Sequence, residues 1–259
     1  ITSNYLRDTI LSASNQMKVF ICFAAEDRYN IAEPIAYNLK NYGIDIWYDR
    51  LNLLLGDNRI DKNIIDGAKN CKYAILIISK VTNKSKCAME EIEVIKKRYS
   101  NKKVVVFPII YNLKPEEIPT SLVWVKQLIF KEVTHRSGTR EICNHIACKI
   151  TNDILNNLSL KKLNDVIDNN LLNIPNEVVK LIYAYLGIDT ENLNARVALL
   201  YAIYICIVSS NQSANVRRII TKIFERIYSE ARLCLEVDYR ELWLLENSLC
   251  ILINDVFLK

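Results

Sequence analysis

Short apolar runs that alternate with segments of helical periodicity dominate the first half of the chain. The run Tyr73–Ile78 has apolar side chains at consecutive positions, so both faces of the strand that it forms must be covered. Similar runs occur at Val19–Phe23, Ile44–Tyr48 and Val104–Ile110, with a shorter one at Leu128–Phe130. Strands and helices that alternate at this spacing predict an α/β fold with a doubly wound, flavodoxin-like parallel sheet of five strands.

The second half of the chain has a different periodicity. After about residue 158 no strand followed by a turn recurs, and apolar residues repeat at helical spacing instead. The segments with this spacing are 161–170, 176–186, 193–209, 215–235 and 239–257. We therefore predict an N-terminal extension of residues 1–15, an α/β domain of residues 16–158 and an all-α helical bundle of residues 159–259.

Composition and charge argue against several classes of protein. The net charge is only +5 and no basic block with interleaved aromatic residues occurs, so nucleic acid is not expected as a partner. The longest apolar run, residues 197–208, is shorter than the roughly 20 residues that span a bilayer, so no membrane partner is expected either. The first residues lack the layout of a signal peptide, and none of the eight cysteines forms a CxxC pair. We expect reduced thiols, no metal site and a cytoplasmic protein.

Five segments in a fixed order carry the functional signal. They are KVFICFAAED at 18–27, IWYDRLNLLLGD at 46–57, YAILIIS at 73–79, SKCAMEEIEVI at 85–95 and PII at 108–110. Their order and spacing resemble the TIR domain over roughly residues 16–150, and in particular prokaryotic NAD-cleaving TIR proteins, here with a helical domain at the C-terminal side. The resemblance implies a TIR fold that takes NAD+ as its substrate and needs no other cofactor.

The resemblance implies that Glu90, three residues after Cys87, is the catalytic glutamate. Cleavage of the bond between nicotinamide and ribose passes through an oxocarbenium-like transition state, and a fixed carboxylate stabilises the positive charge that develops on the sugar. The neighbouring Glu91 is the alternative assignment. A third interpretation gives both glutamates a structural role, as a solvated helix start that the helix dipole favours.

The resemblance also implies candidates for substrate binding. Phe23 and the backbone of Ala24, after the first strand, would flank the nicotinamide or the ribose. Asp49, Asn52 and Gly56, in the loop after the second strand, would shape the pocket. Ligands of open α/β sheets bind beyond the carboxyl ends of the strands, which is where both segments lie.

The start of the helix that carries Glu90 departs from the family pattern. Lys86 stands where many NAD-cleaving members have a tryptophan, so a stacking surface is replaced by a cation that can bind a phosphate. Cys87 follows it and completes the list of substrate-binding candidates. An activated Cys87 thiol is an alternative, but neither His135 nor His145 shows a triad-like neighbour.

Three functions are compatible with these features. We expect an NAD+ glycohydrolase that releases nicotinamide with ADP-ribose or a cyclic ADP-ribose. The resemblance suggests a role in abortive-infection immunity, with activation by oligomerisation. The alternatives are a non-enzymatic module for TIR–TIR interaction, and a helical ligand sensor with the TIR domain as its output.

Two segments indicate partners. The four leucines of LNLLLG at 51–56 predict an exposed contact surface, and we expect a homo-oligomer through the helical domain and through TIR–TIR contacts. Arg218, Lys222 and Arg226 recur every four residues on one helix face, but Glu225 and Glu230 interrupt it, so a solvated surface is the default interpretation. The alternative is a basic face that binds a nucleotide second messenger or a protein activator.

Overall fold

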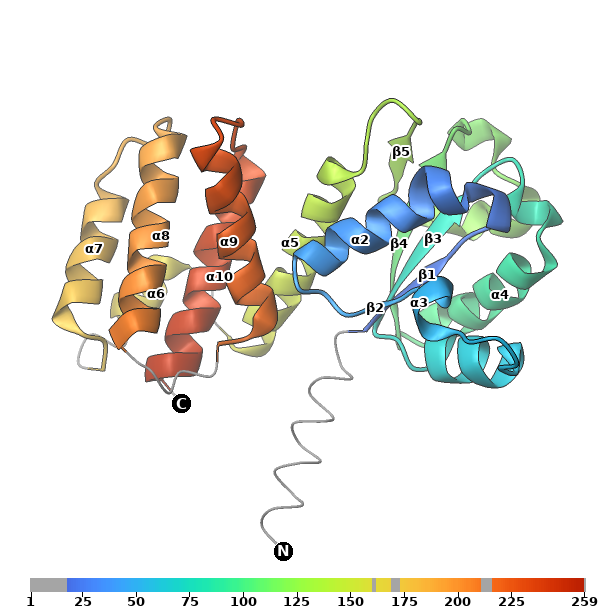
Figure 1. Ribbon diagram of the computed structural model, residues 1–259, viewed down its shortest axis with the longest axis horizontal. Coiled ribbons are helices and arrows are strands. Elements are labelled where there is room, and N and C mark those ends of the chain that lie inside the picture. The colour runs from blue at the N-terminus through green and yellow to red at the C-terminus, as the bar shows by residue number, and fades with distance from the viewer. Residues whose placement is uncertain (1–17, 160–161, 169–172, 211–215, 259) are drawn as a thin grey trace, which may run out of the picture. The chain divides into compact units, whose positions relative to one another are not determined.

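The structure, a computed structural model, describes residues 18–159, 162–168, 173–210 and 216–258 (Figure 1). The predicted N-terminal extension, residues 1–15, lies outside this part of the chain. The chain divides into two compact units, which are described separately below. Unit 1 contains the described residues up to Lys40 and Ile44–Cys143, and unit 2 contains Asn41–Gly43 and the described residues from Asn144 on.

The division between the units falls inside helix α5 (Arg140–Asn157). The predicted domain boundary at residue 158 lies at the other end of the same helix. The division into units describes how the residues pack, whereas the boundary at residue 158 concerns which parts fold independently. The boundary at residue 158 therefore stays a prediction.

Unit 1 contains a parallel sheet of five strands in the order β2-β1-β3-β4-β5, which confirms the predicted fold class. The strands are β1 (Val19–Cys22), β2 (Ile46–Trp47), β3 (Tyr73–Ile78), β4 (Val105–Tyr111) and β5 (Lys131–Val133). β1 pairs with both β2 and β3, so the strand order reverses beside it. All six side chains of β3 are fully buried, as its uninterrupted apolar sequence predicts.

The fifth strand lies three residues later than predicted. The sequence predicts it at Leu128–Phe130, whereas β5 is Lys131–Val133 and pairs with the end of β4. Leu128 and Phe130 instead pack against the core beneath the sheet. The apolar run therefore marks a packing contact, and the strand begins only where the backbone reaches β4.

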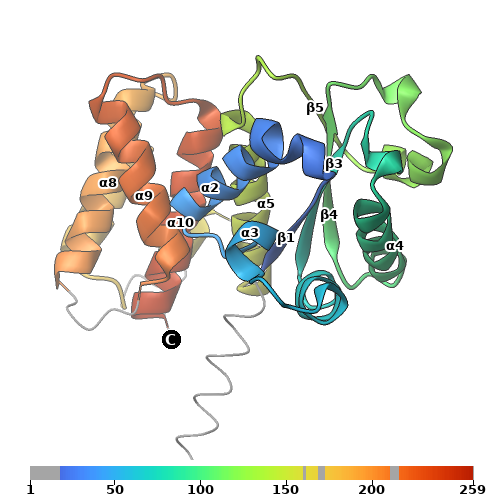
Figure 2. The same ribbon diagram turned by 45° about the vertical axis from the view of Figure 1, so that its right-hand side comes forward.

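Helices cover both faces of the sheet. Helix α2 (Glu33–Asn41) and helix α4 (Lys86–Ser100) lie on opposite sides of it in both views (Figures 1 and 2). On the α4 side the core includes Phe20, Leu76 and Val106 from the strands and Ala88, Ile92 and Ile95 from the helix. The contacts of α4 with the sheet fix which of its side chains face inward.

Four short elements follow the carboxyl ends of β1, β2 and β3. They are a 3₁₀ turn at Ala25–Asp27 with a π-helical turn at Arg28–Ala32, the four-residue helix α3 (Asp49–Asn52), and a 3₁₀ turn at Thr82–Lys84 before α4. A longer π-helix, η3 (Ile60–Ala68), connects the loop after α3 to β3. Because parallel strands end at one edge of the sheet, these connections lie around the place where α/β proteins bind ligands.

Unit 2 is helical throughout its described residues, as the periodicity predicts. Besides α5 it contains α6 (Leu163–Asp168), α7 (Asn176–Leu186), α8 (Leu193–Ser210), α9 (Arg218–Arg232) and α10 (Tyr239–Phe257). Helix α10 packs against α6, α8 and α9, and most of its residues are buried. The described helices are too short or too polar for any of them to cross a bilayer.

Sequence signals for the helix ends of unit 2 are accurate. Asp238, predicted as a helix start, caps α10 by accepting a hydrogen bond from the Glu241 N–H at 2.8 Å, and Glu241 returns a bond to the Asp238 N–H. Such a capping box satisfies two backbone donors at once. Gly187 follows the last residue of α7, which ends where the predicted segment 176–186 ends.

Candidate functional site

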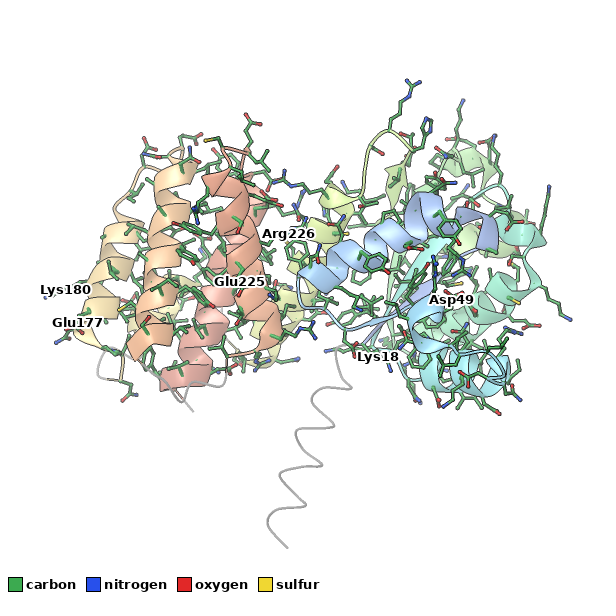
Figure 3. All side chains as sticks on the ribbon, in the orientation of Figure 1. Lys18, Asp49, Glu177, Lys180, Glu225 and Arg226 are labelled. Atoms are coloured by element: carbon green, nitrogen blue, oxygen red, sulfur yellow. The ribbon has the colours of Figure 1, made fainter. Side chains whose placement is uncertain are left out.

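The first predicted site residues lie together beyond β1 and β2. Asp49, labelled in Figure 3, begins α3 and accepts two hydrogen bonds of 2.7 Å from the Arg28 guanidinium. The same guanidinium lies 5.1 Å from the ring centroid of Phe23 and 5.9 Å from that of Tyr48. Ala24, the next residue after Phe23, is fully buried. The bidentate pair therefore joins the segment after β1 to the loop after β2.

The loop after β2 is tied down at its base and exposed at its tip. The Asn52 side chain accepts a hydrogen bond of 2.9 Å from the Tyr48 N–H, so Asn52 closes the first turn of the loop. Gly56 adopts a φ of +96°, a conformation that other residues rarely reach, and no atom lies within 4 Å of where its Cβ would be. Asn52 and Gly56 thus shape the loop. An open hollow of about 360 Å³ beside its base is lined by Arg28, Tyr29, Asp49, Arg50 and Leu53.

Glu90 lies on the second turn of α4, away from the Arg28–Asp49 pair. Ser85 caps this helix by accepting a hydrogen bond of 3.3 Å from the Ala88 N–H. The Glu90 carboxylate pairs with the guanidinium of Arg59, and both side chains remain more than one-third exposed. Glu90 also lines an open cavity of about 700 Å³, whose other lining residues are Ile60, Ile64, Asn83, Lys84, Lys86, Met89, Glu93 and Val94.

Lys86 and Cys87 occupy the exposed first turn of α4. Lys86 lines the same cavity as Glu90, so the structure brings these two predicted residues together. Cys87 is an exposed free thiol. Within the described part of the chain, no three His, Cys, Asp or Glu side chains come together in a way that could hold a metal ion.

Glu91 has a very different environment from Glu90. Its side chain is only 7% exposed, and its Oε1 accepts a hydrogen bond of 2.5 Å from the Asn63 side-chain amide. Burial raises the pKa of Glu91 to about 7, against the opposing effects of a Cys22 hydrogen bond and the Arg59 charge. The charge of Asp49 raises the pKa further. Glu91 therefore interacts with charges from both groups of site residues, the Asp49 pair and the Arg59–Glu90 pair.

Two hydrogen bonds in series, which we call the relay, connect Trp47 through Asn63 to the carboxylate of Glu91. The Trp47 indole N–H on β2 donates a hydrogen bond of 3.0 Å to the Asn63 side-chain oxygen on η3. The amide of Asn63 then faces Glu91 on α4. Trp47, Asn63 and Glu91 are all buried, so the relay is shielded from water.

The candidate site includes residues that sequence patterns alone did not select. Arg28, Arg59 and Asn63 are scattered polar residues whose partners lie far away in the sequence, and no motif marks them. Glu91 does have a signal. Ala88, Ile92 and Ile95 form the apolar face of α4, and Glu91 lies three residues after Ala88, which places it on that face. A charged residue on an apolar helix face indicates a buried, functional or paired group.

The predicted basic face of α9 is engaged in ion pairs within its own helix. Glu225 and Arg226 are labelled on it in Figure 3. Lys222 pairs with Glu225 at 2.6 Å, and Arg226 pairs with Glu230 at 3.2 Å. The Arg226 and Glu230 side chains are only 14% and 17% exposed, and the Arg226 guanidinium also lies 4.2 Å from the ring centroid of Tyr42. Two of the three predicted cations are therefore engaged within unit 2.

A family model for the TIR domain matches residues 19–141. The chain is 30% identical over 112 residues to the NAD(+) hydrolase TcpA of Theionarchaea archaeon (strain DG-70-1), a match that covers 43% of this chain and 34% of that protein. It is 32% identical over 111 residues to the 2' cyclic ADP-D-ribose synthase BtTIR of Bacteroides thetaiotaomicron, which covers 43% of this chain and 38% of that protein.

The matched segment spans little more than a third of the length of these two curated relatives. Among solved structures, the chain is similar to the TIR domain of the Toll-related Receptor TRR-2 from Hydra magnipapillata. That comparison gives a TM-score of 0.37 and 20% identity, and covers 44% of this chain and 82% of the other.

Proposed function

Residues 19–141 form a TIR domain, and from this premise we propose that the protein cleaves NAD+ between nicotinamide and ribose. The names of the two curated relatives support this proposal, because one is an NAD+ hydrolase and the other a cyclic ADP-ribose synthase. The products are nicotinamide and either ADP-ribose or a cyclic ADP-ribose. The two outcomes differ in whether water or another group of the substrate attacks the same ribosyl cation.

The observation that carries the proposal is a partly exposed carboxylate on the wall of a cavity. Glu90 lines about 700 Å³ of open space, enough to receive a large part of a dinucleotide. When the bond between nicotinamide and ribose breaks, its electron pair leaves with nicotinamide and positive charge develops on the ribose. Glu90 can stabilise that charge if the substrate displaces its ion pair with Arg59.

The other predicted residues have supporting roles in this proposal. Phe23 and the backbone of Ala24 flank the nicotinamide or the ribose, and Asp49 keeps that wall in place through Arg28. Asn52 and Gly56 shape the loop after β2.

The first turn of α4 contributes to the same pocket. Lys86 binds a phosphate at the rim of the cavity beside Glu90, and Cys87 lies next to it.

The experiment is to measure nicotinamide release from NAD+ by the purified protein and by two single variants. We expect Glu90→Gln to lower the rate by about 10²-fold or more, the effect of removing one electrostatic stabiliser. Glu132→Gln on β5, which removes an exposed carboxylate elsewhere in unit 1, is the matched control and should keep the wild-type rate. Circular dichroism checks that each variant is folded.

Glu91→Gln decides between the two glutamates. If Glu91→Gln abolishes cleavage while Glu90→Gln retains it, Glu91 is the catalytic carboxylate. If wild-type protein releases no nicotinamide in any oligomeric state, the domain is a non-enzymatic module for interaction with other TIR domains.

We also propose that the activity serves abortive-infection immunity in the cytoplasm and that assembly activates it. An enzyme that destroyed NAD+ continuously would harm its own cell, so a trigger is required. Leu54 and Leu55, exposed at 78% and 108%, offer an apolar surface for contact between copies. A nucleotide second messenger or a protein that binds the helical unit is the candidate trigger.

A further inference from the structure

Trp47, Asn63 and Glu91 come from three different elements and meet in the interior of unit 1. Trp47 belongs to β2, Asn63 to η3 and Glu91 to α4. The two hydrogen bonds that join them measure 3.0 Å and 2.5 Å. Each of these buried polar groups would be costly to leave without its hydrogen bond.

The relay has only one favourable arrangement. An indole N–H can only donate, so Trp47 forces the oxygen of the Asn63 side chain toward itself and the amide N–H₂ toward Glu91. Gly67 in η3 allows the indole to lie where it does, because a Cβ at that position would be 2.6 Å from the Trp47 Nε1. The orientation of the Trp47 indole therefore sets the orientation of the Asn63 amide, which in turn sets the position of the Glu91 carboxylate.

Besides Asn63, the Glu91 carboxylate interacts with charged groups of the proposed catalytic site. Arg59 pairs with Glu90 through one nitrogen, while its other terminal nitrogen, Nη1, is buried without a hydrogen-bond partner. The charges of Arg59 and Asp49 both act on the Glu91 carboxylate. The groups that face Glu91 are the Cys22 thiol on β1, Asp49 on α3, Arg59 before η3 and the amide of Asn63.

We infer that Trp47 and Asn63 are positioning residues that hold Glu91 as the second carboxylate of the site, beside Arg59 and Glu90. The inference rests on the proposed cleavage of NAD+. Ionised Glu91 attracts Arg59 and loosens its hold on Glu90, and it adds negative charge close to where the ribosyl cation forms. Neutral Glu91 does neither. The charge of Glu91 therefore controls whether Glu90 is free to meet the substrate.

The inference predicts how cleavage depends on pH. Burial raises the pKa of Glu91 to about 7, so the carboxylate is mostly neutral below that pH and ionised above it. The rate should rise with pH through this range. The Asn63 amide stabilises the ionised form, so removing that amide raises the pKa of Glu91 and moves the rise to higher pH.

The first test needs no enzymatic activity. The chain has three tryptophans, whose indole N–H groups give separate signals in a ¹H–¹⁵N spectrum of the full-length protein. The Trp47 signal, identified by its loss in Trp47→Phe, should shift between pH 5.5 and 8.5 with a midpoint near 7 and stop shifting in Glu91→Gln. The Trp124 indole is buried without a hydrogen-bond partner, so its signal should stay constant.

The second test measures nicotinamide release against pH in Asn63→Ala and Trp47→Phe. Both should move the rise in rate upward by about one pH unit, which lowers the rate about fivefold at pH 7, with recovery at high pH. Trp124→Phe is the matched control and should reproduce the wild-type profile. A variant that was merely misfolded would lose activity at every pH.

Two results would overturn the inference. One is a Trp47 signal that does not titrate, or that titrates unchanged in Glu91→Gln. The other is a pH profile in Trp47→Phe that parallels the wild-type profile. If the protein cleaves no NAD+ while the Trp47 signal titrates as expected, the relay exists and the proposed function is the part that fails.

Discussion

Two adjacent glutamates on α4 show how strongly position controls the chemistry of a residue. Successive residues on a helix point about 100° apart. Glu90 therefore faces an open cavity and a partner cation, while Glu91 faces the core beside Ile92. The first arrangement suits a carboxylate that must meet a substrate. The second suits a carboxylate whose charge changes near neutral pH.

The burial of Glu91 predicts a pH-dependent cost in stability. Its pKa is raised to about 7 in the folded chain from 4.5, so between these values the folded state holds a proton that the unfolded state releases. The contribution of Glu91 to stability is therefore greatest below about pH 4.5 and falls as pH rises to 7. Glu91→Gln should stabilise the protein by on the order of 3 kcal/mol at pH 8.5 and much less at pH 5.

Urea unfolding at these two pH values measures the difference between Glu91→Gln and wild type. Glu93→Gln, which removes an exposed carboxylate from the same helix, is the control and should change stability by no more than about 0.5 kcal/mol at either pH. An equal effect of Glu91→Gln at both pH values would show that the carboxylate does not titrate in this range.

At the scale of elements, the loop after β2 combines a rigid base with an apolar tip. The Arg28–Asp49 pair and the Tyr48–Asn52 hydrogen bond hold the base in place. At the tip, the Asp57 carboxylate accepts a hydrogen bond of 2.8 Å from the Leu54 N–H, and Leu55 is entirely exposed. A stable loop that presents leucines to water is suited to contact between copies.

We predict that Leu55→Asp lowers NAD+ cleavage by at least tenfold without unfolding the protein, because a charge at the tip opposes apolar contact between copies. Leu54→Asp should act in the same way. Rates are measured over a range of protein concentrations, since wild type should gain activity with concentration. Leu233→Asp, at a leucine of unit 2 that is 74% exposed against 78% for Leu54, is the control for the substitution. Full activity of Leu55→Asp at every concentration would contradict a role for the loop in assembly.

At the scale of the whole molecule, unit 2 has a core of its own. Helix α10 buries residues such as Leu245, Leu249 and Ile251 against its neighbours. An internal polar cluster adds to this core, because Arg196 contacts both Tyr185, at 2.6 Å, and Glu246, at 3.0 Å. A helical unit with a core of its own can hold copies of the chain together while the TIR domain acts.

We predict that the full chain is a homo-oligomer through residues 160–259. Light scattering should give a mass that is a multiple of 30.0 kDa. Leu54→Asp and Leu55→Asp should keep this mass, because they alter the TIR surface alone. A monomeric protein whose rate per molecule is independent of concentration would exclude control by assembly, and would make the helical unit a lid or a ligand sensor.

Local sequence determined the layers of this protein. The short apolar run Tyr73–Ile78 between turn residues favours a strand covered on both faces, and the spacing of Ala88, Ile92 and Ile95 buries one side of a helix. These patterns, with five ordered motifs, were enough to predict the parallel sheet, the helical second half and the TIR family. Each of these patterns involves residues that are close together in the sequence, which is why it can be recognised without the structure.

Tertiary structure decided which polar groups meet. Arg28 and Asp49 are 21 residues apart, Asn63 and Glu91 are 28 apart, and Arg59 and Glu90 are 31 apart. No local pattern records such pairs, because they form only when different connections converge on one edge of the sheet. Burial then set the charge of Glu91, since the cost of ionising a carboxylate depends on the whole environment around it and not on its neighbours in sequence.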